Sequence, residues 1–136
     1  MHTRQILVTL FLLLAITGCS QATATNTLIE YQRAGGLLNF NDRLTIQSDG
    51  SGVVVRSGQR NGITLTPAEI QSLTTKMNSA DFTNLQPAYN APPPHADLIT
   101  YILTYKGYTV QLMDGMIPVP LQPALDELNR VVERKP

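Results

Sequence analysis

Hydrophobic and polar residues alternate through much of the chain after residue 27, and this period of two predicts β-strands. The alternation is clearest in residues 44–47, 98–106 and 108–113, and it is weaker in residues 28–33. Residues 53–56 are predicted to be a strand because they are rich in β-branched valine. Because residues 98–106 carry apolar side chains on both faces, they should form a central strand. The pattern therefore predicts an antiparallel sheet of about five strands.

Turn residues separate the predicted strands. Gly107 divides the last two strands, and Asp49-Gly50 follows the strand at residues 44–47. The first acids of a calcium loop could look similar, but the further acids of such a loop are missing. Asn61-Gly62 is typical of a hairpin turn and predicts a second hairpin, with residues 63–65 as a short strand after it.

Two segments have the spacing of amphipathic helices. Thr66 can cap a helix that begins with Pro67, and Glu69 completes a capping box. Four apolar residues then share one helical face: Ile70, Leu73, Met77 and Ala80. A last helix should run to about residue 134 with a buried stripe of Leu121, Leu125, Leu128 and Val132, and Asp126 can pair with Arg130. The predicted fold is α+β, with both helices packed on one face of the sheet.

Two irregular segments are candidates for function. Gly35 and Gly36 break the first strand, and Leu37, Leu38 and Phe40 follow them. We expect these three apolar side chains to fold inward, the alternative being exposure to a partner. Residues 81–97 form the longest irregular stretch, stiffened by the prolines at 92–94, and this loop is either functional or a plain surface connection.

The first twenty residues predict export from the cytoplasm. Arg4 precedes an apolar run at residues 6–16, which is too short to span a bilayer and suits a secretory signal. The run ends in Ile16-Thr17-Gly18-Cys19, which resembles a bacterial lipobox. A plain cleaved signal with an incidental cysteine is the alternative. The resemblance implies a lipoprotein signal peptide at residues 1–18.

The lipobox also implies where the mature protein lies. Bacterial lipoproteins of this kind carry two or three acyl chains, palmitate among them, on the residue that corresponds to Cys19, and several chains anchor a protein durably. Residues 19–27 would then be the lipidated cysteine and a flexible tether of roughly 20 Å at most, followed by one globular domain at residues 28–136. Ser20 after the cysteine implies the outer membrane in a two-membrane bacterium, or the outer leaflet of the plasma membrane otherwise.

Composition argues against several classes of function. Loss of the signal leaves nine basic residues against ten acidic ones, so nucleic-acid binding has no electrostatic support. Cys19 is the single cysteine and His95 the single histidine of the mature chain, which gives neither a zinc cluster nor a Cys-His pair. His95 with Asp97 could form half of a metal site or of a catalytic triad, but we favour a surface histidine. We expect no enzyme activity, no metal and no cofactor.

Several short motifs occur in one order along the chain: Arg33-Ala34-Gly35-Gly36, Ala80-Asp81-Phe82, Ala96-Asp97, Thr100-Tyr101-Ile102-Leu103-Thr104, Asp114-Gly115, and Pro120-Leu121 with Leu125 and Leu128. This series resembles the emfourin family, small protein inhibitors of protealysin, a thermolysin-like metalloprotease. The series covers most of residues 28–132, with alanine where the family more often has serine after the arginine. The resemblance implies a compact α+β domain that binds another protein.

The sequence therefore predicts a lipid-anchored envelope protein with a small protein-binding domain. The resemblance implies that this domain inhibits a thermolysin-like metalloprotease. The alternative is a structural or assembly lipoprotein without inhibitory activity, and a hydrolase dependent on His95 is a third class. We expect the partner, a metalloprotease or an envelope component, to contact two loops. Their residues are Gly35, Gly36, Leu37, Leu38 and Phe40 in the first loop, and Tyr89, His95 and Asp97 in the second.

Overall fold

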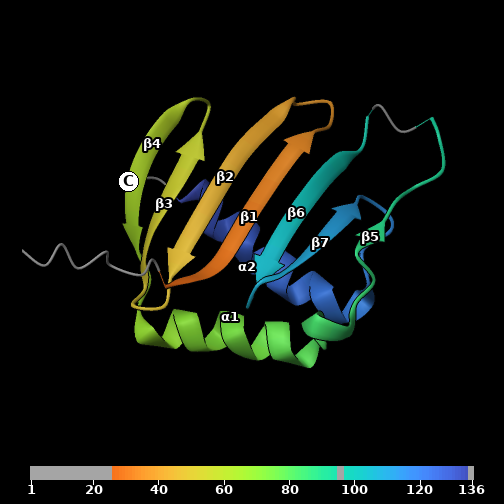
Figure 1. The fold of residues 1–136 in the computed structure, drawn as a ribbon. Helices are drawn as coiled ribbons and strands as arrows, with labels where there is room; N and C mark the ends of the chain where they lie inside the picture. Colours follow the sequence, from red (N-terminus) through yellow and green to blue (C-terminus); the bar gives the residue numbers. More distant parts are fainter. Residues whose placement is uncertain (1–25, 95–96, 135–136) are drawn as a thin grey trace, which may run out of the picture.

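The computed structural model describes residues 26–94 and 97–134, which form one seven-stranded sheet and two α-helices (Figure 1). The strands lie in the order β4-β3-β2-β1-β6-β7-β5, and neighbours are antiparallel except β5 and β7. The elements are β1 (Thr27–Gly35), β2 (Phe40–Gln47), β3 (Ser51–Arg56), β4 (Gln59–Thr64), α1 (Pro67–Ser79), η1 (Phe82–Asn84), β5 (Ala88–Tyr89), β6 (Ile99–Tyr105), β7 (Tyr108–Met113), η2 (Val119–Leu121) and α2 (Gln122–Glu133).

The α+β class is confirmed, whereas the prediction of about five antiparallel strands differs from the mixed sheet of seven. One strand, β5, has no predicted counterpart, and β4 extends the short strand predicted at residues 63–65. Strand β5 has two residues and lies within residues 81–97, where the sequence predicts no regular structure. Two residues are too few to show an alternation, and β5 forms because it pairs in parallel with β7. Strand β6 lies between β1 and β7, in the central position that its apolar faces predict.

The turn between β3 and β4 differs from the predicted one. It is formed by Ser57-Gly58, whereas Asn61-Gly62 lies inside β4. Ser57 has φ +51° and Gly58 has φ +78°, and two consecutive positive φ values are what a two-residue hairpin of this twist requires. The strand is therefore longer than predicted and begins at Gln59.

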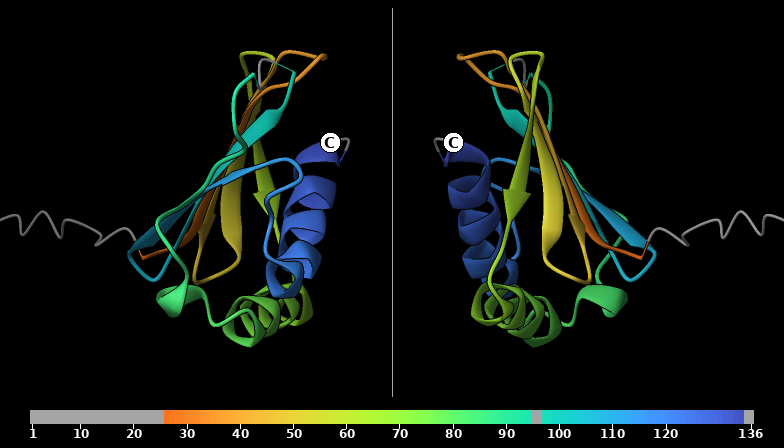
Figure 2. Two further views of the ribbon diagram at one scale, coloured as in Figure 1. Left: turned by 90° about the vertical axis from the view of Figure 1, so that its right-hand side faces the viewer. Right: turned by 90° about the vertical axis from the view of Figure 1, so that its left-hand side faces the viewer.

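Both helices lie on the same side of the sheet, α2 along its face and α1 across its lower end (Figure 2). Thr66 and Glu69 form the predicted capping box of α1. The α1 face is buried at Leu73, Met77 and Ala80 and half-buried at Ile70, and the α2 stripe is buried at Leu121, Leu125, Leu128 and Val132. These residues pack on the inward-facing side chains of the strands, which are Ile29, Tyr31, Leu44, Ile46, Val54, Tyr101, Leu103, Tyr105, Val110 and Leu112.

One predicted ion pair of α2 is wrong. The Arg130 side chain donates to the backbone carbonyl of Asp126, while the Asp126 carboxylate accepts from Gln122 at 2.8 Å. In the described part of the chain, no helix is long and apolar enough to cross a bilayer. The predicted signal at residues 1–18, Cys19 and nearly all of the tether lie outside the described residues.

Candidate functional site

The hairpin of β1 and β2 ends in the most exposed apolar pair of the described chain. Its turn spans residues 36–39 and is closed by a hydrogen bond from the Asn39 N–H to the Gly36 carbonyl at 2.9 Å. The Leu37 and Leu38 side chains are 86% and 79% exposed. The expectation that they fold inward is wrong, because the turn projects past the end of the sheet, beyond the faces that the helices cover. Phe40, at the start of β2, is half-buried.

Two glycines fix the base of this turn. Gly35 and Gly36 have φ +83° and +72°, which disfavour any residue with a β-carbon. A Cβ at Gly36 would lie 2.7 Å from Cγ1 of Ile99, and a Cβ at Gly35 would lie 3.2 Å from the carbonyl oxygen of Leu98. The turn therefore rests against the beginning of β6, and only glycine allows this approach.

A buried arginine holds the hairpin to the rest of the domain. Arg33 on β1 and Asp42 on β2 are paired across the strands, and both side chains are 4% exposed. Arg33 Nε donates to Asp42 Oδ2 at 2.7 Å, and Nη1 donates to Glu133 Oε1 at 2.9 Å and to Asn129 Oδ1 at 3.1 Å. The guanidinium also stacks 4.2 Å from the centre of the Phe40 ring.

This network ties the hairpin to α2. Burial alone would lower the pKa of Arg33, but the hydrogen bonds to Asp42 and Glu133 outweigh it, and the net shift is upward. The guanidinium is thus charged at every accessible pH. The leucines are consequently displayed on a base that is fixed from two strands and one helix.

Sequence reasoning missed the roles of Arg33 and Asp42, although a signal was present. Arg33 is in phase with Ile29 and Tyr31, and Asp42 is in phase with Leu44 on the next strand. Two opposite charges on the inward faces of adjacent strands indicate a buried pair. Asp49, by contrast, lies in a turn and accepts from the Ser51 N–H at 2.9 Å, whereas Asp42 accepts from the buried Arg33.

Three of the motifs quoted for the resemblance, those of β1, β6 and Asp114, meet near the base of the same hairpin. Asp114 accepts from the Ile99 N–H at 3.2 Å and from the Tyr101 hydroxyl at 3.0 Å. Tyr101 stacks on Tyr31 with ring centroids 6.2 Å apart. Burial, and then Asp114, raise the pKa of Tyr101, so its phenol remains a hydrogen-bond donor. The arginine–glycine motif, the β6 motif and the Asp114 turn thus form one structural unit.

The second predicted contact loop joins this surface only in part. Asp97 is exposed and directly precedes Leu98, the residue beside Gly35. Tyr89 lies on β5, three strand spacings or about 14 Å from β1, and its hydroxyl accepts from the Gln86 N–H. Tyr89 is half-buried against the core and belongs to no common patch with the leucines. His95 lies outside the described residues. We define the tip surface as Gly35, Gly36, Leu37, Leu38 and Phe40.

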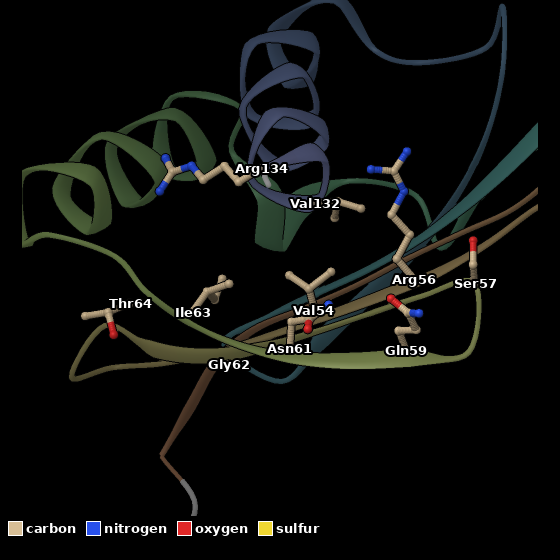
Figure 3. Close-up of a pocket in the computed structure, with 10 residues that line it drawn as sticks. All are labelled: Val54, Arg56, Ser57, Gln59, Asn61, Gly62, Ile63, Thr64, Val132 and Arg134. Carbon is tan, nitrogen blue, oxygen red and sulfur yellow. The ribbon is translucent and has the colours of Figure 1, made fainter. Parts of the chain in front are cut away.

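A second surface feature lies away from the tip, between the β3–β4 hairpin and the end of α2 (Figure 3). It is a groove of about 440 Å³ with apolar side chains from Val54, Ile63 and Val132. Arg56 and Arg134 line it as well, and Arg134 forms an ion pair with Glu69. The sequence prediction contained no contact residue in this groove.

Among the described residues, no three His, Cys, Asp or Glu side chains gather in the manner of a metal site. Comparison of the sequence with protein-family models and with curated proteins finds no match in either.

Proposed function

We propose that this chain is a lipid-anchored envelope protein whose domain binds another protein through the tip surface. The observation that carries the proposal is the pair Leu37 and Leu38, exposed at the end of a hairpin that Arg33 and two glycines hold in place. A convex apolar tip on a rigid base fits a concave apolar site, and a preformed loop loses little conformational entropy on binding.

The family resemblance supports a thermolysin-like metalloprotease as the partner and inhibition as the outcome. In this mechanism the domain acts by occupying the protease and performs no reaction of its own. Full burial of a leucine side chain is worth about 1.5–3 kcal/mol. The two leucines together would therefore contribute roughly 3–6 kcal/mol, or a factor of about 10²–10⁴ in affinity.

Titration of thermolysin-like metalloproteases with the soluble domain from Thr25 onward tests the proposal. We expect loss of proteolytic activity with the natural sequence and at least a hundredfold weaker inhibition with Leu37→Asn/Leu38→Asn. Val119→Asn is the matched control, because Val119 is 84% exposed and belongs to η2. Segment η2 contacts α1, which lies across the end of the sheet opposite the tip (Figure 1). Far-UV circular dichroism should show the same fold for all three proteins.

Two outcomes would contradict the inhibitor form. Unchanged protease activity at micromolar domain would do so directly, and equal inhibition by the leucine variant would remove the tip surface from the mechanism. Co-purification with a stable envelope complex that contains no protease would instead favour a structural or assembly lipoprotein.

The anchor is tested separately from the binding surface. Cys19→Ser should abolish acylation by labelled palmitate, while the soluble domain binds as before. Equal palmitate labelling of the Cys19→Ser protein and the natural sequence would contradict the lipoprotein assignment.

A further inference from the structure

Strand β4 forms one edge of the sheet and pairs with β3 alone in the described chain. Antiparallel partners alternate between hydrogen-bonded and non-hydrogen-bonded pairs. The Leu65 N–H donates to the Gly50 carbonyl at 2.8 Å, so Ile63, Asn61 and Gln59 follow in phase as hydrogen-bonded residues. The backbone N–H and C=O groups of the intervening residues point away from β3. Those residues are Arg60, Gly62 and Thr64.

The two edges of the sheet are protected differently. Strand β5, at the other edge, has two residues and lies between Pro87 and the prolines at 92–94, which cannot donate to a further strand. Strand β4 has six residues and contains no proline. A Cβ at Gly62 would have no atom within 4 Å, so no described residue covers the outer face of the strand at its middle.

The groove of Figure 3 runs beside this open edge. Its lining includes Gln59, Asn61, Gly62, Ile63 and Thr64 of β4. Successive side chains of an added strand would point to opposite faces of the sheet. Every second side chain would therefore enter the groove and meet the apolar surface of Ile63, Val54 and Val132 on one side of the sheet.

The charges around β4 define the kind of segment that fits. Residues 50–68 contain two arginines, Arg56 and Arg60, and no acidic residue. Both arginines are exposed, and neither forms an ion pair with another described residue. An added strand lies about 5 Å from its neighbour, within reach of the Arg60 side chain. A second copy of β4 would bring like charges together, whereas an acidic segment would neutralise them.

We propose that the edge of β4 binds an extended acidic segment of a partner protein as an eighth strand of the sheet. Backbone hydrogen bonds to Arg60, Gly62 and Thr64 hold the segment, its apolar side chains enter the groove, and its carboxylates lie beside Arg60 on the other face. This surface is separate from the tip surface, so it stands whether or not the domain inhibits a protease.

The test uses a synthetic peptide of about ten residues in which glutamate alternates with valine, the length of an ordinary strand. We expect its titration into the ¹⁵N-labelled domain to shift the amide signals of Arg60, Gly62 and Thr64 most strongly, and to slow their hydrogen exchange. A peptide in which lysine replaces glutamate should bind at least tenfold more weakly. Arg60→Glu should reverse this preference.

Gly62→Pro removes the N–H that points to the open edge and leaves the β3 hydrogen bonds in place. We expect it to weaken the glutamate peptide at least tenfold, while Gly62→Ala, which keeps the N–H, binds as the natural sequence does. Unchanged circular dichroism establishes that each variant is folded, and Arg60→Glu is an independent variant should Gly62→Pro not fold.

Three results would overturn the proposal: no binding of the glutamate peptide at millimolar concentration, equal binding of the lysine peptide, or shifts confined to other strands. Concentration-dependent dimerisation that Gly62→Pro abolishes would assign the edge to a second copy instead. Because the readout involves no protease, a failed inhibition assay and a failed peptide titration can be distinguished.

Discussion

Removal of the Asp42 carboxylate is the most direct test of the buried network beneath the hairpin. Asp42→Ala leaves the Arg33 guanidinium buried without the partner that its Nε contacts at 2.7 Å. Breaking a buried ion pair from one side costs about 3–5 kcal/mol. Glu133, 2.9 Å from Arg33 Nη1 and 52% exposed, still balances part of the charge. We therefore expect a loss near the lower limit, about 3 kcal/mol.

A domain of this size should remain folded after such a loss, since natural domains have about 5–15 kcal/mol of stability. At about 4 °C per kcal/mol, the Tm should fall by about 12 °C. Urea unfolding followed by far-UV circular dichroism measures the change, because the chain has no tryptophan to report it by fluorescence. Asp126→Ala is the matched control: it removes an exposed carboxylate and should change stability by less than about 0.5 kcal/mol.

The double variant Arg33→Met/Asp42→Leu separates the cost of an unpaired buried charge from the cost of altering the packing at this position. Well-packed apolar residues in place of a buried pair are often neutral or stabilising. We expect the double variant to be within about 1 kcal/mol of the natural sequence. A double variant as unstable as Asp42→Ala, or an Asp42→Ala protein of unchanged stability, would refute the explanation by an uncompensated buried charge.

Three further changes have defined outcomes. Gly36→Ala should cost about 1–2 kcal/mol in urea unfolding, because φ is +72° and the new Cβ meets Ile99, and Ile99→Ala in the same chain should recover part of the loss. Burial raises the pKa of Tyr31 above its usual value of about 10. The free energy of unfolding should therefore be unaffected below pH 10 and should fall by up to about 1.4 kcal/mol per pH unit above pH 10. Tyr31→Phe should flatten this slope. Thr66→Ala should cost about 1 kcal/mol and Thr66→Ser only a few tenths in the same measurement, a difference that equal losses would contradict.

Local chemistry explains which parts of the fold could be predicted. The start of α1 is determined by Thr66, Pro67 and Glu69 within four residues, and the structure has it as predicted. Strand β5 could not be predicted, because its pairing with β7 depends on residues distant in sequence. Asn61-Gly62 predicted a turn at the wrong place, and Ser57-Gly58 forms the turn instead. The pairing of all six residues of β3 with β4 sets the register, and it outweighs the turn preference of a single dipeptide.

The candidate site was predictable in position and not in orientation. Gly35 and Gly36 mark a turn from sequence alone, but whether the next two leucines point inward depends on where the sheet ends. The support beneath the turn comes from Glu133 and Asn129, about a hundred residues away, and no local pattern links them to Arg33. The groove beside β4 likewise requires α2 to lie over the hairpin, which the sequence pattern does not specify.

The direction of β1 has a consequence for the height at which a partner would be met. Thr27 and Gly35 are eight residue steps apart, or about 26 Å along an extended strand. With acylation at Cys19, the proposed tether enters at Thr27, and the leucines project from the opposite end. Adding the tether's limit of roughly 20 Å places Gly35, at the base of the tip, at most about 46 Å from the acylated cysteine. Partners would thus be bound at a distance from the lipid surface. A longer tether would increase the distance between the bilayer and the tip surface without altering the tip surface itself.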